Sequence, residues 1–344
     1  MPSSTSSSEA RPRARRVPTA FLLAVLLFAA GDRLLWSNNG WLHFVSRYTP
    51  PGPNGDPLLS TVAIRDLPPP SELPILLLGS SQVREGLDCA PFERRLPDRP
   101  CRNLGISAGS PLDILYLWRQ IERAAPRHVM VLGLFPKVLH GRLKEPFVSL
   151  DTVGCLLSRG TWKRLTGSDW IDVAFGLLQG LSPSLRYKDG FWDFHGVVRP
   201  DLRAAWAWRM PPQPTRRLGQ EPPQPPEYFA LRLGKVDPEG VRPSLAGAQE
   251  EALERLLAGE KRRGNRVVEN DFPTRTGYES TLLPETLANH RRIVAGLARR
   301  RDITFVSGED LPRLDLTDFL DFTHLAKSGR AKVSERVAEI LARR

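Results

Sequence analysis

The sequence contains little cysteine, with three residues in 344, and this scarcity excludes several classes of protein. Three thiols are too few for a scaffold held together by disulfides, and an all-thiolate zinc site needs four. No H-E-x-x-H or related spacing places histidines beside carboxylates, so we expect no metal site and no cofactor. Hydrophobic residues make up 41% of the chain, which is enough at this length to bury a large core.

Lysine is also scarce, because the net charge of +11 arises from 41 arginines against 8 lysines. The patterns that recognise nucleic acid are missing: there is no RRM-type aromatic motif, no zinc-finger spacing and no long basic block. Residues 1–16 alone carry four arginines and one glutamate. We attribute the positive charge to compositional bias and a targeting signal, and expect no nucleic-acid partner.

A long apolar run follows that basic stretch. Val17 to Ala30 resembles the hydrophobic region of a secretory signal, and Ala29-Ala30-Gly31 offers a site for its cleavage. The alternative is an uncleaved helix over residues 17–36, which at 1.5 Å per residue extends about 30 Å and can cross a bilayer. We predict this single-pass anchor, with residues 1–16 in the cytoplasm and the C-terminal domain on the extracytoplasmic side of the membrane.

Export changes what the cysteines are expected to do. Cys89 and Cys101 are separated by twelve positions and would meet an oxidising environment, which favours a disulfide between them and leaves Cys155 over. Three reduced thiols in the core are the alternative that the sequence leaves open.

The rest of the chain divides into a tether and a folded domain. Residues 37–72 are rich in proline and indicate extended, turn-rich chain, and the domain is expected over 73–344 with an insertion at 140–245 that is partly helical. Strands are predicted over 75–78, 102–107, 128–133 and 303–306, and helices over 111–124, 249–258, 284–300 and 328–342. This alternation predicts an α/β fold: a three-layer, flavodoxin-like parallel sheet with helices on both faces.

Three short motifs fall where such a sheet binds ligands, beyond the carboxyl ends of its strands. Gly79-Ser80-Ser81 ends the first strand, Asn103 to Gly109 follows the second, and Asp321-Phe-Thr-His324 precedes the last helix. A serine nucleophile needs a base, and the base needs an acid that orients it. Each motif alone is weak, since Gly-Ser-Ser segments and isolated D-x-x-H pairs are most often ordinary turns.

In this order the three motifs resemble those of the SGNH, or GDSL-like, hydrolase superfamily. The resemblance implies that Ser81 is the nucleophile, His324 the base and Asp321 the acid. It also implies an oxyanion site formed by Ser81, Ala108 and Gly109. Apart from the resemblance, Asn103 and Gly105 lie in a loop that a ligand can approach closely, and Lys137 and His140 follow the carboxyl end of the third strand, so we expect these four residues to line the substrate.

One position departs from the family pattern. The third-strand block of the family, Gly-x-Asn-Asp, aligns with Gly133-Leu-Phe-Pro136, so that Phe135 stands where an asparagine would donate to the oxyanion. Losing one such donor typically costs about 10²–10³ in turnover.

The serine in place of the usual aspartate of G-D-S resembles the membrane-anchored branch that includes the D-alanyl transfer protein of lipoteichoic acid synthesis. That branch implies a tethered serine esterase or O-acyltransferase acting on acyl esters of an envelope glycan or polymer, with a membrane-bound O-acyltransferase as its partner. The alternative is a catalytically degenerate scaffold or carbohydrate-binding partner in an envelope complex. A nucleotide-binding module on the same sheet is a weaker reading, because neither G-x-x-x-x-G-K-[ST] nor G-x-G-x-x-G is present.

Overall fold

The computed structural model describes residues 19–49, 52, 55–69, 71–136, 139, 149–188, 246–275, 278, 282, 284–300 and 302–343. In this part of the chain the centre is a parallel sheet with the strand order β2-β1-β3-β4-β5. The strands are β1 Ile75–Gly79, β2 Cys101–Asn103, β3 Val129–Leu134, β4 Arg266–Asp271 and β5 Ile303–Val306. The predicted α/β class with a parallel sheet is therefore confirmed.

Strands β1 and β3 are continuous apolar runs because helices cover both of their faces. Every residue of β1 and β3 is buried, and the two strands pair in register so that Gly79 lies beside Gly133 at their carboxyl ends. Strand β4 was not predicted from the sequence. Its second half carries Glu269, Asn270 and Asp271, and this polar run hides the apolar signal of Val267 and Val268.

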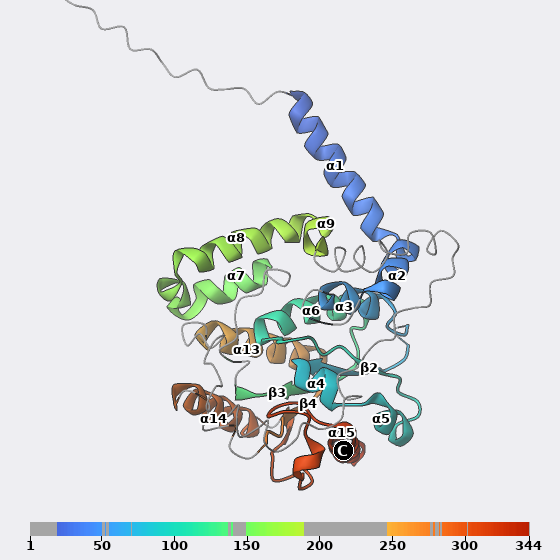
Figure 1. Ribbon diagram of the computed structural model, residues 1–344, viewed down its shortest axis with the longest axis vertical. Coiled ribbons are helices and arrows are strands. Elements are labelled where there is room, and N and C mark those ends of the chain that lie inside the picture. Colours follow the sequence, from blue (N-terminus) through green and yellow to red (C-terminus); the bar gives the residue numbers. More distant parts are fainter. Residues whose placement is uncertain are drawn as a thin grey trace, which may run out of the picture.

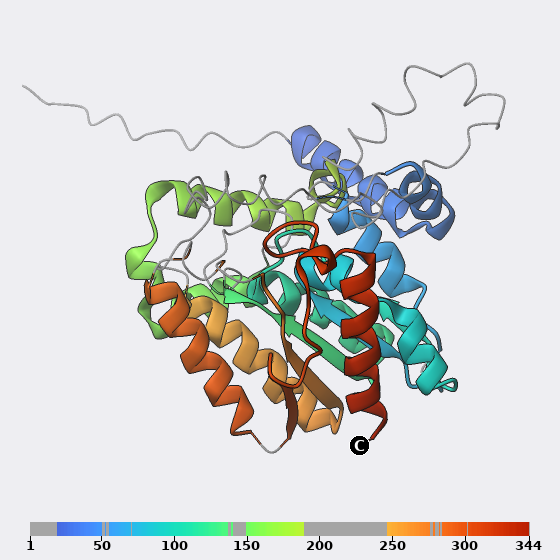
Figure 2. The same cartoon turned by 60° about the horizontal axis from the view of Figure 1, so that its bottom comes forward.

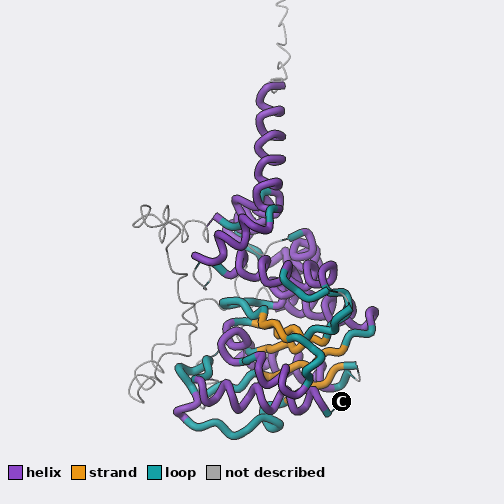
Figure 3. Tube along the Cα trace, turned by 90° about the vertical axis from the view of Figure 1, so that its right-hand side faces the viewer, coloured by secondary structure: helices purple, strands orange, loops and turns teal. Residues whose placement is uncertain are grey.

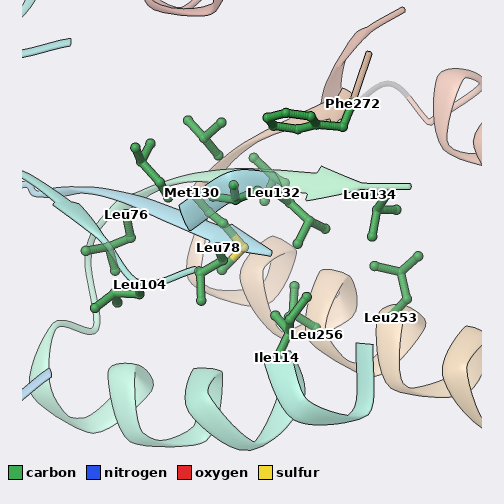
Figure 4. Close-up of a cluster of buried hydrophobic side chains, with 14 of the residues drawn as sticks. Leu76, Leu78, Leu104, Ile114, Met130, Leu132, Leu134, Leu253, Leu256 and Phe272 are labelled. Atoms are coloured by element: carbon green, nitrogen blue, oxygen red, sulfur yellow. The ribbon is translucent and has the colours of Figure 1, made fainter. Parts of the chain in front are cut away.

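Two groups of helices enclose the sheet (Figure 2). On one face α6 packs against α13, α13 contacts β4, and α14 is joined to α13 by the Arg292–Glu250 ion pair. Figure 4 shows this interface, where Leu76 and Leu78 face Ile114 of α6 and Leu256 of α13. On the other face α15 packs against α5 and α4. These helices are α4 Ser81–Gly86, α5 Cys89–Arg95, α6 Pro111–Ala124, α13 Ala246–Arg263, α14 Pro284–Ala298 and α15 Lys327–Ala342, and the short 3-10 helix η6 Leu316–Asp318 precedes α15.

Helix α13 is longer than predicted. The sequence suggests that Gly259 ends it, but the helix continues to Arg263. A Cβ atom at Gly259 would lie 2.3 Å from the ring of Trp118, so the glycine admits the indole of α6 and does not end the helix.

The region predicted as an extended tether, residues 37–72, contains two helices instead, α2 Asn39–Tyr48 and α3 Asp56–Arg65. They bury apolar side chains with the end of α1 Thr19–Ser37, and Tyr187 from the insertion joins them; the members are Trp36, Leu42, Val45, Leu58, Val62 and Tyr187. The prolines that favour extended chain lie outside α2, and Pro57 occupies the first turn of α3, where proline is tolerated. This region is thus packed against the rest of the protein.

Helix α1 projects from the body of the molecule (Figure 3). The anchor was predicted over residues 17–36. Residues 17 and 18 are outside the described residues, and residues 19–36 belong to α1. Among the described helices, none combines the length and the apolar character required to cross a bilayer.

The described part of the insertion, residues 149–188, is helical. It consists of α7 Leu150–Leu157, η3 Ser158–Arg164, α8 Gly167–Leu181 and α9 Pro183–Arg186. Helix α7 packs on α6 and α13, and α8 runs along the outside of this layer near the base of α1 (Figure 1).

A disulfide joins Cys89 to Cys101, the first residues of α5 and β2, while Cys155 is a buried thiol in α7. The structure thus contains the pairing that export favours.

Candidate active site

Ser81 and His324 are 243 positions apart in the sequence and meet at the carboxyl edge of the sheet. Ser81 begins α4 directly after β1, and the Ser81 hydroxyl oxygen lies 2.9 Å from Nε2 of His324. Glycine is required before this turn: a Cβ at Gly79, where φ is +157°, would lie 2.3 Å from Val83 and 2.8 Å from the Gly133 carbonyl oxygen. The distance is that of a hydrogen bond between a nucleophile and its base.

Asp321 completes the chain of hydrogen bonds. Its Oδ2 atom lies 2.7 Å from Nδ1 of His324, and its Oδ1 atom accepts the backbone N–H groups of Thr323 and His324, both at 2.8 Å. A carboxylate only accepts, so Nδ1 carries the proton and Nε2 is left to accept the Ser81 hydroxyl. Burial favours the neutral acid, but the hydrogen bonds from the His324 ring and from the backbone N–H groups of Thr323 and His324 outweigh it and hold the pKa of Asp321 below its usual value.

The two candidate oxyanion donors in the loop after β2, the N–H groups of Ala108 and Gly109, differ in their hydrogen bonds. Ala108 is exposed and has a φ of 49°, a left-handed conformation that is uncommon for alanine. No hydrogen bond in the described part of the chain uses its N–H group. The N–H of Gly109, by contrast, donates to the carbonyl of Ile106 at 3.2 Å, which leaves it committed to the turn. Ser81 is the first residue of α4, so its N–H has no partner inside the helix.

Asn103 and Gly105, which were predicted to line a substrate, make contacts with α4 and with each other. The Asn103 amide donates to the carbonyls of Val83 and Leu87 at 3.0 and 2.9 Å, and its oxygen accepts the N–H of Gly105 at 3.0 Å. A Cβ at Gly105 would lie 2.4 Å from the backbone nitrogen of Arg84. Asn103 therefore holds α4 against the loop through its hydrogen bonds. Gly105 lets the backbone of α4 approach the loop closely, because there is no room for a side chain at this position.

Two charged residues that the sequence did not single out support the same loop. Arg84 donates to both oxygens of Asp56 at 2.9 and 3.0 Å and to the Ser107 hydroxyl at 2.5 Å. Asp56, which begins α3, also accepts the backbone N–H of Ser107. Arg84 stands three positions after Ser81, whereas Asp56 lies in the segment predicted to be a tether, where no motif marks it.

The position expected to hold an oxyanion asparagine is occupied by an aromatic ring. Phe135 follows β3, is 5% exposed and packs against Tyr278 with ring centroids 5.6 Å apart. Tyr278 also neighbours Phe322, at 6.5 Å, and burial together with the charge of Asp321 raises the pKa of its phenol. An aromatic group thus borders the site on the side of β3.

The remaining predicted residues lie elsewhere. Lys137 and His140 are outside the described residues. Within the described ranges, no three or more histidine, cysteine or acidic side chains are grouped to hold a metal ion. His128 is at the amino end of β3, buried against Glu260, and is remote from Ser81 in the sheet.

No model of a known protein family matches this chain, and no curated protein matches it either.

Proposed function

We propose that the chain is a serine esterase or O-acyltransferase, tethered to a membrane and acting outside the cytoplasm on acyl esters of an envelope glycan or polymer. The observation that carries the proposal is the continuous hydrogen-bond chain from Ser81 through His324 to Asp321. The resemblance of the motifs to SGNH hydrolases and the Cys89–Cys101 disulfide support it, because disulfides persist in oxidising compartments.

The geometry supports a two-step acyl transfer. The Ser81 oxygen attacks the acyl carbonyl and passes its proton to Nε2 of His324, while Asp321 holds the ring in the required tautomer and stabilises the imidazolium. The N–H groups of Ser81 and Ala108 are the donors for the negative charge on the carbonyl oxygen. His324 then protonates the departing alcohol, which leaves an acyl-Ser81 ester.

In the second step His324 accepts a proton from water or from a hydroxyl of the acceptor. That oxygen forms a bond to the acyl carbon, the ester bond to Ser81 breaks, and His324 returns its proton to the Ser81 oxygen. Water as the nucleophile gives an esterase, whereas a polymer hydroxyl gives an O-acyltransferase. A membrane-bound O-acyltransferase would supply acyl groups to the second reaction.

Phe135 favours a second candidate function. A buried ring occupies the place of the expected oxyanion amide, and a site with fewer donors suits a non-catalytic scaffold or a carbohydrate-binding partner.

Fluorophosphonate labelling distinguishes the two functions. The enzyme predicts covalent labelling of the wild-type protein and of Ser307→Ala, a serine outside the site, and loss of labelling in Ser81→Ala. Absence of labelling in correctly folded wild-type protein, with full complementation by Ser81→Ala, would favour the scaffold. The two enzyme activities are then distinguished by measuring whether the acyl group is transferred to a polymer hydroxyl or released by hydrolysis.

A further inference from the structure

Helix α8 exposes several large apolar side chains, whereas an ordinary surface helix keeps such side chains on its buried face. Asp169 and Gln179 are 3% and 1% exposed, whereas Ile171, Leu178 and Leu181 are 70%, 52% and 66% exposed. The exposed apolar positions Ile171, Ala174, Leu178 and Leu181 recur at intervals of three and four, which places them on one side of the helix. These four residues are called the α8 stripe below.

The α8 stripe is joined to a second exposed apolar helix. Arg33 of α1 donates to the carbonyl of Leu181 at 3.4 Å, and Asp32 accepts the Ser182 hydroxyl at 2.6 Å and the Ser184 N–H at 3.1 Å. Asp32 is 7% exposed, so this polar joint is well enclosed. Beyond it, α1 exposes large apolar side chains, each between 47% and 66% exposed: Leu23, Val25, Leu26, Leu27 and Phe28.

The residues beside the α8 stripe are those of a membrane interface. Trp170 is 39% exposed within α8, and Trp162 is 43% exposed in η3, immediately before it. Lys163 and Arg164 follow Trp162 and are exposed, with the Lys163 ammonium 5.7 Å from the Trp162 ring centre. Tryptophan is enriched where one end of a side chain is apolar and the other wet, and exposed basic residues attract anionic headgroups.

From this continuity we propose that the α8 stripe lies on a lipid surface, with α8 resting in the interface beside the end of α1. The proposal rests on the membrane location in the proposed function and adds the face that the domain turns toward the bilayer. Lipid is the occupant that fits, because the exposed apolar residues are shared between two helices on the side from which α1 projects (Figure 1) and do not form a single groove for a partner helix. Lys163 and Arg164, the exposed basic residues of η3, favour an anionic surface.

The test compares two exposed leucines in the full-length protein. Leu178→Cys labels the α8 stripe, and Leu316→Cys is a matched control: Leu316 is 54% exposed on η6, which contacts α15 on the opposite face of the sheet. Each variant carries a bimane fluorophore and is reconstituted into vesicles of phosphatidylcholine and phosphatidylglycerol in equal parts, with and without doxyl-labelled lipid. Thermal unfolding by circular dichroism verifies that both variants keep the wild-type fold.

The expected result is that doxyl lipid quenches the label at position 178 several-fold more strongly than the label at position 316. Equal quenching, or none at position 178, would overturn the proposal. Shielding of position 178 that grows with protein concentration and ignores doxyl lipid would assign the α8 stripe to a second copy of the chain and would overturn it as well.

Fluorophosphonate labelling of the same samples keeps this proposal separate from the proposed chemistry. Labelling of Ser81 without quenching at position 178 rejects only the lipid-facing surface. Quenching without Ser81 labelling rejects only the enzyme.

Discussion

The carboxylate of Asp56 accepts a hydrogen bond from the backbone N–H of Ser107, 51 positions further along the chain. Ser107 directly precedes Ala108, the proposed oxyanion donor, and Asp56 is also held by two hydrogen bonds from Arg84. A residue from the N-terminal segment therefore positions the loop that borders Ser81. It is a positioning residue, since its side chain contacts the loop, Arg84 and the backbone N–H of Gly52.

We expect Asp56→Ala to lower the turnover per folded molecule by about 10–100-fold, because displacement of a donor by about 1 Å costs on the order of 10² in rate. The loss should appear in kcat more than in KM, as measured with a chromogenic acyl ester or as the rate of fluorophosphonate labelling. Asp66→Ala is the control, because Asp66 is half exposed and pairs only with His43 among the ion pairs of the described residues. A loss fully explained by a smaller folded fraction would contradict the positioning role.

Replacement of the Asp321 carboxylate tests its proposed role in orienting His324, the base. Asp321→Asn is expected to reduce turnover by about 10³–10⁴-fold, because an amide no longer fixes the proton on Nδ1 of His324. Asp310→Asn, an exposed aspartate outside the triad, should keep the wild-type rate. Unchanged labelling of Ser81 in Asp321→Asn would remove Asp321 from the proposed mechanism.

The same group gives a prediction for pH. The folded pKa of Asp321 is lowered, so its contribution to stability is complete above its ordinary pKa of about 3.9 and is lost as pH falls through the folded value. Because Asp321→Asn removes this titration, its urea midpoint should fall less on acidification below about pH 4 than that of the wild type. If the urea midpoints of the two proteins fall equally with pH, the Asp321 carboxylate has the same pKa in the folded and unfolded states.

The turn between β1 and α4 predicts the cost of a single methyl group. In Gly79→Ala the new Cβ would meet Val83 at 2.3 Å and the Gly133 carbonyl oxygen at 2.8 Å. We expect a loss of about 1–3 kcal/mol in the free energy of unfolding, the usual cost of overpacking, measured by urea denaturation. Gly308→Ala is the matched control, since nothing lies within 4 Å of a Cβ there. Equal midpoints for the two variants would show that α4 moves aside easily.

The sequence predicted the parts of the fold that depend on local pattern. Periodicity located α6 at its observed bounds, and buried apolar runs located β1, β3 and β5. It missed β4, because Glu269 and Asn270 give a polar character to a strand whose four central residues are buried. In the candidate site, Ser81, His324 and Asp321 carry a motif and were predicted to meet.

Long-range contacts explain what the sequence did not reveal. Asp56 contributes to the site only because α3 packs beside the loop after β2, and nothing in its local sequence records that packing. Asn103 and Gly105 belong to a motif, but their hydrogen bonds and close contacts with α4 depend on where that helix lies. An asparagine and a glycine in this motif are compatible with contacts to a substrate and with contacts to a helix, and the sequence alone does not distinguish the two.

A buried contact between a histidine and a carboxylate at the other end of the sheet supplies the last prediction. His128 and Glu260 are both almost completely buried, with Nε2 3.0 Å from Oε2, and Trp118 donates to the second oxygen of Glu260. Burial opposes the charge of Glu260, but the partners His128, Trp118 and Asn265 outweigh it and lower its pKa. The carboxylate therefore stabilises the fold above its ordinary pKa of about 4.3, and this contribution is lost as pH falls through the lower folded value.

Glu260→Gln removes the carboxylate from the buried contacts with His128 and Trp118 and should lower the free energy of unfolding by about 1–3 kcal/mol near neutral pH. Its urea midpoint should also decline less than that of the wild type between pH 5 and pH 3, because the titrating carboxylate is gone. Glu254→Gln, on the same helix but 39% exposed in its pair with Arg300, should follow the wild-type curve. If Glu260→Gln has the same urea midpoint as the wild type near neutral pH and at pH 3, the contact between His128 and Glu260 contributes nothing beyond the packing of α6 against α13.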